Sequence, residues 1–190
     1  AEMPEMLSQA RAALVLARTA ASHGSGVEQA LVAALSDRFQ ADSAVADMAP
    51  WSDAYAVAMR RVFQQFPEDL DVIMLCVDAM MNRTPWLMWD LCEGVPNPDA
   101  DTVECRQMLE TQIASIRAES GSFHPGIWHL YVHLMEMSPE PEKALRVADE
   151  LRGLVPDAGH LEHMSTHIYV LCGDYQAVVA ANHAGIVADE

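Results

Sequence analysis

The chain has 190 residues, and its 28 Asp and Glu against 11 Lys and Arg give a formal net charge of −17. A hydrophobic share of 51% is enough for a packed core, so the composition excludes a disordered tail. The acidity argues against nucleic acid and anionic membranes as partners, because both bind through Lys and Arg. The longest unbroken apolar run, residues 72–77, is also too short to cross a bilayer.

Ala, Leu, Met and Val at helical spacing dominate the chain, and alternating β-branched runs are missing. The pattern therefore predicts an all-α fold. Breaker residues separate the expected helices, which lie near 4–22, 26–46, 52–65, 69–83, 101–119, 126–137, 140–154, 159–172 and 174–188.

Two segments resemble the second helix of a tetratricopeptide repeat. One follows the turn Gly173-Asp174-Tyr175, and the other runs from Tyr55 to the closing Pro67. We therefore expect a tetratricopeptide-like array, an α-solenoid of antiparallel helical hairpins. It would form a single domain over 1–190, with N-terminal helices in 1–50 and repeats in 51–190.

The four cysteines are spread along the chain, and no two of them form a CxxC pair. Cys76 and Cys172 lie in apolar helical patterns, where a buried thiol acts as a small hydrophobe. This usage favours reduced cysteines in a cytoplasmic protein over disulfides, although a cleaved signal peptide would leave no trace.

Histidine is the most informative residue type in the chain. Six of the eight histidines fall between residues 124 and 167. At about 100° per residue, His129, His133 and Glu136 share one face of the helix expected at 126–137. The same spacing puts His160, His163 and His167 on one face of the next expected repeat. Each helix thus carries an HxxxH pair, which brings two imidazoles close enough to hold one metal ion.

The two pairs are in register. His163 follows His129 by 34 residues, and His167 follows His133 by the same 34, the length of a tetratricopeptide repeat. Equivalent positions on neighbouring first helices would direct both pairs into one groove. We therefore predict a transition-metal site with six ligands: His124, His129, His133, His160, His163 and His167.

The identity and number of the ions stay open at this point. Imidazole suits copper, iron and zinc, whereas Mg²⁺ and Ca²⁺ prefer oxygen ligands. One ion is compatible with the pattern, and so are two ions with three histidines each, divided as His124, His129 and His133 against the other three. Glu136 is the candidate catalytic residue, as a metal ligand or as a general base toward metal-bound water.

Three further residues are candidates for a pocket around this groove. Asp78 would line the groove one repeat earlier, Trp86 offers an aromatic wall, and Met164 lies beside His163. Large apolar side chains at helical spacing are more often core residues, so packing is the competing interpretation of Trp86 and Met164.

Several motifs of this chain occur together in a known family: HPxxxHxxxHxxE from His124, GHxxHM from Gly159, and HIY from His167. They resemble a poorly characterised family of histidine-rich tetratricopeptide-repeat proteins from bacteria and fungi. The resemblance covers about residues 50–190 and departs at Ser165-Thr166, where we expect Pro-Ser. It implies further repeats, with another histidine motif, beyond Glu190. The family brings no settled activity.

Three functions remain compatible with the sequence. The first is a metalloenzyme acting on a small molecule, with redox chemistry favoured over hydrolysis because the ligands are rich in nitrogen. The second is a peptide-binding module, although such grooves use Lys, Arg and Asn, and the third is metal storage or delivery. Self-association is also expected, because no following helix covers Val178, Val179 and Ile186.

Overall fold

A computed structural model describes residues 2–41, 47–119 and 121–190, with side chains from Glu5 onward. The described residues are helical apart from one short hairpin of strands, so the all-α prediction is confirmed. The elements are α1 (Glu2–Ala21), α2 (Gly26–Arg38), α3 (Ala49–Gln65), α4 (Leu70–Met81), β1 (Trp89–Asp90), β2 (Val95–Pro96), α5 (Thr102–Ala118), α6 (Pro125–Met135), the 3₁₀ helix η1 (Pro141–Ala144), α7 (Leu145–Leu151), α8 (Gly159–Met164), α9 (Thr166–Cys172) and α10 (Tyr175–Asp189).

Most predicted boundaries lie within about three residues of these elements. The helix expected over 26–46 is an exception, because α2 ends at Arg38, and Phe39 leaves the helical region at φ −124°. Residues 42–46 of that prediction lie outside the described residues. The β1–β2 hairpin was also not predicted. Each of its strands has only two residues, and Gly94 closes the turn at φ +67°.

The chain forms two compact units, Ala1–Arg83 and Thr84–Glu190. In the first unit each helix packs on the next one in the sequence, from α1 to α4. A capping box starts α2, where the Ser25 N–H donates to Glu28 at 2.7 Å and the Glu28 N–H donates to the Ser25 hydroxyl. The single-domain organisation and its division at residue 50 stay predictions.

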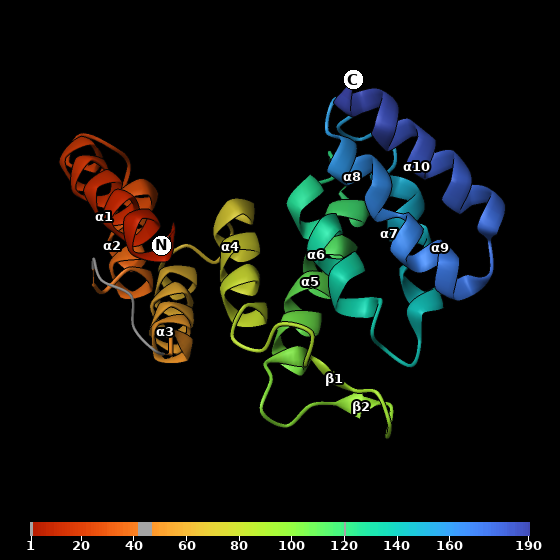
Figure 1. Cartoon of the computed structure of the whole chain (residues 1–190), viewed down its shortest axis with the longest axis horizontal. Helices are drawn as coiled ribbons and strands as arrows, with labels where there is room; N and C mark the ends of the chain where they lie inside the picture. Colours follow the sequence, from red (N-terminus) through yellow and green to blue (C-terminus); the bar gives the residue numbers. More distant parts are fainter. Residues whose placement is uncertain (1, 42–46, 120) are drawn as a thin grey trace. The chain divides into compact units, whose positions relative to one another are not determined.

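The second unit contains all six of the clustered histidines. Here α5 packs on α6, α6 contacts α7, α8 and α9, and α10 packs along α8 and α9 (Figure 1). The apolar face of α6 is buried through Ile127, Trp128 and Leu134. Its opposite face is left to the histidines, so the helix is anchored by its core side while its polar side stays accessible.

The helix predicted over 159–172 is divided into α8 and α9 at Ser165. Ser165 keeps helical dihedral angles, φ −59° and ψ −24°, so the division leaves the helix direction locally similar. Its hydroxyl is fully buried and has no hydrogen-bond partner. This is also the position at which the chain departs from the Pro expected by resemblance.

Two glycines allow α8 and α10 to approach closely. A Cβ atom built on Gly185 would lie 2.9 Å from the carbonyl oxygen of Gly159, and one on Gly159 would lie 2.6 Å from the oxygen of Gly185. Both distances are shorter than van der Waals contact. The crossing therefore requires glycine on both helices, and it places α10 directly beside His163.

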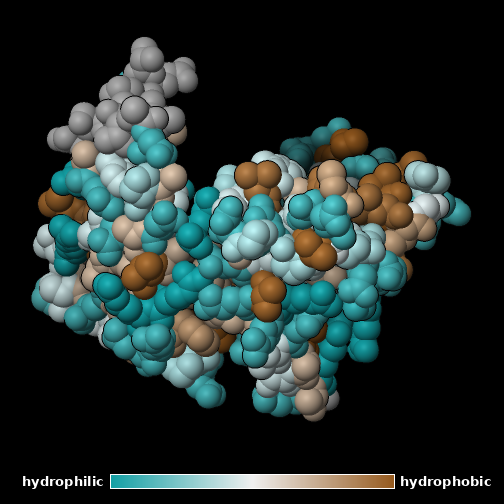
Figure 2. Space-filling view, turned by 90° about the horizontal axis from the view of Figure 1, so that it is seen from below, coloured by the Kyte–Doolittle hydropathy of each residue, from teal (hydrophilic) through white to brown (hydrophobic). Residues whose placement is uncertain are grey.

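The surface of the second unit carries apolar side chains over α9 and α10. Val170, Leu171, Val179 and Ile186 are all exposed, and brown apolar patches gather toward this end of the unit in Figure 2. Exposed side chains of this kind favour self-association, which stays a prediction. No helix among the described residues combines the length and the apolarity needed to cross a membrane.

The glycine crossing predicts the effect of Gly185→Ala. In an unobstructed helix this change stabilises by about 0.5–1 kcal/mol, because Gly loses more backbone freedom on folding. Here the new methyl group meets a backbone carbonyl, so we expect a loss of about 1–3 kcal/mol in urea unfolding. Gly26→Ala is the control, because its methyl group would meet only the Phe66 ring at 3.6 Å. A stabilised Gly185→Ala protein would contradict the close crossing.

Candidate metal centre

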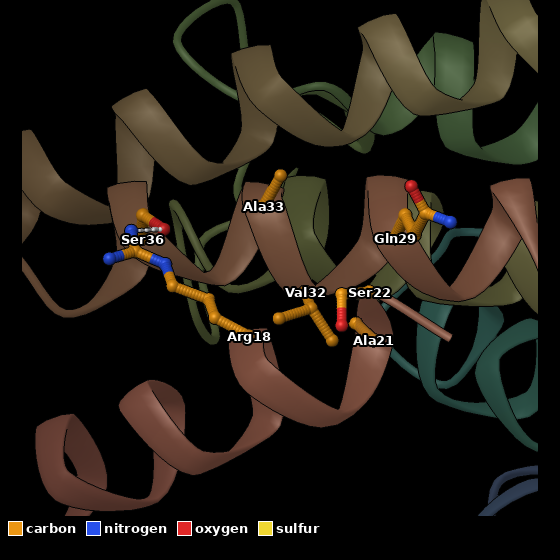
Figure 3. Close-up of a pocket in the computed structure, with 7 residues that line it drawn as sticks. All are labelled: Arg18, Ala21, Ser22, Gln29, Val32, Ala33 and Ser36. Atoms are coloured by element: carbon orange, nitrogen blue, oxygen red, sulfur yellow. Dashed lines mark hydrogen bonds between the residues drawn. The ribbon is translucent and has the colours of Figure 1, made fainter. Parts of the chain in front are cut away.

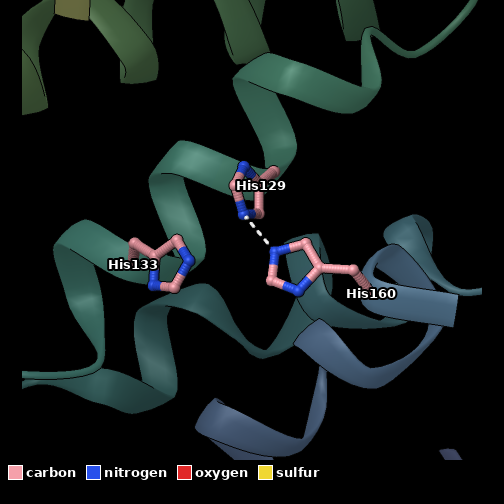
Figure 4. Close-up of side chains that lie close together, drawn as sticks. All are labelled: His129, His133 and His160. Carbon is pink, nitrogen blue, oxygen red and sulfur yellow. Dashed lines mark hydrogen bonds between the residues drawn. The ribbon is translucent and has the colours of Figure 1, made fainter. Parts of the chain in front are cut away.

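Five imidazole rings from three helices converge on one face of the second unit. Consecutive turns of α6 present His129 and His133, α8 presents His160 and His163, and α9 presents His167. Figure 4 shows His129, His133 and His160 directed toward one another across the space between α6 and α8. The structure thus brings together five of the six predicted ligands.

The cross-helix contacts are offset from the 34-residue register. His129 Nε2 lies 3.1 Å from His160 Nε2, a partner 31 residues away, and Glu136 contacts His167, also 31 residues away. The difference of about three residues is close to one helical turn. The two histidine-bearing segments therefore lie side by side, but with a stagger of about one turn.

Glu136 occupies the centre of the cluster and joins two of the helices. One carboxylate oxygen contacts His133 Nδ1 at 2.8 Å, and the other contacts His167 Nδ1. Burial pushes the pKa of Glu136 upward, but the hydrogen bonds from His133 and His167 outweigh it and lower the pKa to about 2. Since an ionised carboxylate only accepts, both Nδ1 atoms carry the hydrogen.

This geometry bears on the role predicted for Glu136. A carboxylate with so low a pKa is a weak general base near neutral pH. Its two oxygens are already hydrogen-bonded behind the imidazoles of His133 and His167. That arrangement is typical of a carboxylate that orients metal-binding histidines.

Asn182 on α10 does for His163 what Glu136 does for its two partners. The Asn182 side-chain NH₂ donates to the Val178 carbonyl at 3.1 Å, so its oxygen is the atom that faces His163 Nδ1 at 2.9 Å. His163 therefore donates from Nδ1 as well. Its Nε2 atom lies 3.1 Å from the Nε2 atom of His167. Two lone pairs would face each other there unless a proton or a metal ion lies between them.

The upper part of the cluster favours neutral imidazole. Burial, followed by the nearby His133, His160 and His167, lowers the pKa of His129 to about 4. The pKa of His160 is lowered by burial and by neighbouring histidines, while Asp189 acts in the opposite direction. A neutral imidazole has the free lone pair that a metal ion requires.

Two groups of side chains have the spacing of a metal site. One ligand atom from each of His129, His133 and His160 lies within 4.8 Å of the others, and the same holds for His133, Glu136 and His167. His133 belongs to both groups. Imidazole nitrogens dominate the set, which suits zinc, copper or iron.

His124 belongs to neither group. It is the N-cap of α6, and its Nδ1 accepts the backbone N–H of Ile127 at 3.2 Å. Five residues before His129, it lies about 140° around the helix from the ligand face. The structure thus corrects its predicted neighbourhood, because His124 starts the helix that carries the cluster.

The three predicted pocket residues lie in different surroundings. Met164 has no exposed surface, so it packs in the core and lines no open pocket. Trp86 is 70% exposed and has a positive φ of 64°. Asp78 belongs to the first unit, where its Oδ1 accepts from the Asn82 side chain at 3.0 Å and burial raises the pKa of Asp78. A place in the groove stays a prediction for Asp78 and Trp86.

An open pocket of about 370 Å³ borders the cluster on its α10 side. Its walls include His160, His163, Asn182 and Asp189, so it combines ligand histidines with an amide and a carboxylate. A second pocket, of about 330 Å³, lies between α1 and α2 in the first unit (Figure 3). It contains one guanidinium group, from Arg18, which is hydrogen-bonded to Ser36. Only the pocket beside α10 adjoins the histidines.

Asn182 and Asp189 were missed by the sequence analysis. They lie 19 and 26 residues after His163, on a helix that was interpreted only through its apolar side chains. No motif spacing marks either residue. Their position next to the centre depends on the close crossing of α8 and α10, which Gly159 and Gly185 permit.

Comparison with known proteins adds no support to either the fold or the site. No protein-family model, curated protein or solved structure matches this chain. The function therefore has to be argued from the residues of the centre themselves.

The hydrogen bonds predict the tautomers of the metal-free protein. At a pH where the rings are neutral, His133, His163 and His167 should carry the hydrogen on Nδ1, as measured by long-range ¹H–¹⁵N correlation NMR. Asn182→Asp keeps the acceptor and should keep this form of His163. Asn182→Leu removes the acceptor and should move His163 toward the Nε2–H form. An Nε2–H form of His163 in the unchanged protein would contradict the assigned geometry.

Proposed function

We propose that this chain binds a transition metal in the α6, α8 and α9 cluster and uses it as a metalloenzyme on a small molecule. The observation that carries the proposal is the convergence of five imidazoles, with two pairs of Nε2 atoms each 3.1 Å apart. Two nitrogens bound to one ion at about 2.0–2.1 Å, with an angle of about 90–110°, lie about 2.9–3.4 Å apart. The ligand spacing therefore corresponds to that of a metal centre.

The surroundings of the cluster support a catalytic role over a storage role. The hydrogen bonds to Glu136 and Asn182 hold three of the rings in place, which gives the defined geometry of a tight site. The adjoining pocket of about 370 Å³ has room for a small molecule next to His160 and His163. Storage of many loosely held ions would need no such positioning.

The chemistry we propose is redox chemistry on copper or iron, with hydrolysis on zinc as the alternative. Nitrogen-rich ligand sets suit all three metals. The metal would supply electron transfer or Lewis acidity, and the protein would supply ligand geometry and a pocket for the substrate. The acidic chain, with a net charge of −17, also attracts cations at long range.

We also propose that α6 to α10 are tetratricopeptide-like pairs of the histidine-rich family described above. The helices pack as neighbours in chain order, and α6 lies next to α8 and α9 as consecutive first helices do in such arrays. A 34-residue repeat with a stagger of about one turn accounts for the contacts between them.

The proposal predicts the metal content of the protein purified without an affinity tag or chelator. Mass spectrometry of the metal should find copper, iron or zinc bound, and His133→Ala and His167→Ala should each lower the content at least tenfold. Two controls should leave it unchanged: His183→Ala removes an exposed histidine outside the cluster, and Ser165→Ala removes a buried hydroxyl without a partner.

A second measurement connects binding to folding. Because a metal that binds only the folded state stabilises it, about 2.7 kcal/mol is expected at a free concentration one hundred times the dissociation constant. Chelation should therefore lower the midpoint of thermal unfolding, and adding the metal back should restore it. A protein that contains no metal and takes none up would contradict the proposal and favour a peptide-binding groove.

A further inference from the structure

The clustered rings form a chain of neighbours. The centroids of successive rings lie 5.1 Å apart for His160 and His129, 4.7 Å for His129 and His133, 5.4 Å for His133 and His167, and 4.9 Å for His167 and His163. Two imidazoles that share one ion at a tetrahedral or right angle have centroids about 4.5–5.2 Å apart. Each neighbouring pair is therefore at or close to the separation that a shared ion gives.

The ends of this chain are too far apart for a single ion to serve all five rings. His160 and His163 are separated by 6.3 Å and His133 and His160 by 6.4 Å between centroids. Those values approach the separation of two imidazoles on opposite sides of one ion, about 6.4 Å. One four-coordinate ion cannot place both pairs on opposite sides and also keep the shorter contacts.

The hydrogen bonds to Nδ1 point to the same division. Glu136 holds His133 and His167 through Nδ1, and Asn182 holds His163 through Nδ1. The nitrogen left to bind a metal is therefore Nε2 in all three rings. The two Nε2 pairs, His129 with His160 and His163 with His167, each have the 3.1 Å separation of ligands on one ion.

We propose that the centre holds two transition-metal ions, one between His129 and His160 and one between His163 and His167. His133 lies between the two positions and completes the first of them. Glu136 is a positioning residue for both positions and not a ligand, because its oxygens are occupied by Nδ1–H groups. This inference rests on the proposed function, and it divides the histidines across the helices, unlike the sequence-based division along each helix.

The two positions also differ in their surroundings, which gives the ions different roles. The pocket beside α10 is lined by His160 from the first position and by His163 from the second. A small molecule in that pocket would thus lie against both positions at once. Asp189 in the pocket wall brings a carboxylate close to His160, which favours a substrate with a cationic or hydrogen-bond-donating group.

The number of ions is measured by titrating the metal-free full chain with Zn²⁺ in a calorimeter and by native mass spectrometry. The unchanged protein should bind two Zn²⁺ ions. His160→Gln should bind one ion, held at the second position, and His163→Gln should bind one ion, held at the first. His183→Gln is the matched control and should still bind two. Circular dichroism of each variant verifies that the helices are kept.

Cu²⁺ loading gives an independent readout of the distance between the ions. Two Cu²⁺ ions at neighbouring positions couple magnetically, so the paramagnetic resonance signal per copper should fall below that of an isolated ion. Each single-position variant should return the full signal of one isolated Cu²⁺ ion. Full uncoupled intensity in the doubly loaded protein would contradict adjacent positions.

The outcomes separate this inference from the proposed function. One Zn²⁺ ion per chain, lost in either glutamine variant, would overturn the two-ion centre and leave a mononuclear metal site. Complete loss of binding in only one of the two variants would also overturn it, because the positions would not be distinct. No binding of Zn²⁺ or Cu²⁺ by the unchanged protein would contradict the proposed function itself.

Discussion

The carboxylate of Glu136 accepts hydrogen bonds from two imidazoles on different helices, His133 on α6 and His167 on α9. A half-buried ionised carboxylate is costly unless it is hydrogen-bonded, and these two N–H groups meet that need. In return, the carboxylate fixes the ring orientation and tautomer of both histidines, and it ties together helices that are 31 residues apart. The arrangement of the other rings follows from this link, because His163 is held opposite His167 and His129 lies one turn before His133.

The scaffold around this link is helical and buried, which gives it precision. The side of α6 opposite the histidines packs through Ile127, Trp128 and Leu134, so the helix has little freedom to rotate. On the other side, the crossing of Gly159 and Gly185 brings α10 close enough for Asn182 to reach His163. Ligands placed on packed helices are held more accurately than ligands on loops.

The sequence was sufficient for the helical class and for the face on which the histidines lie, because both follow from a period of about 3.6 residues. It could not predict the stagger of about one turn between neighbouring helices, which depends on how their side chains interlock. As a result, the sequence paired His129 with His163, whereas the structure pairs it with His160. The helix-capping role of His124 was missed for a similar reason, since only the true start of α6 at Pro125 reveals it.

The residues behind the ligands were the least predictable part of the centre. Asn182 has no motif and is recognised only because α10 folds back against α8. Glu136 was predicted from its helical spacing, but its two hydrogen bonds assign it to orienting imidazoles and not to removing a proton. Met164, although it follows His163 directly, faces the core because one residue turns a helix by about 100°.

The central claim is that imidazole Nε2 atoms, and not the Glu136 carboxylate, form the inner ligand shell. X-ray absorption spectroscopy of the Zn²⁺-loaded chain tests it most directly, because imidazole rings give a characteristic multiple-scattering pattern. The account predicts nitrogen ligands at about 2.0–2.1 Å with at least two imidazoles per ion, unchanged in Glu136→Gln apart from weaker binding. A shell dominated by oxygen, or the loss of one oxygen ligand in Glu136→Gln, would contradict it.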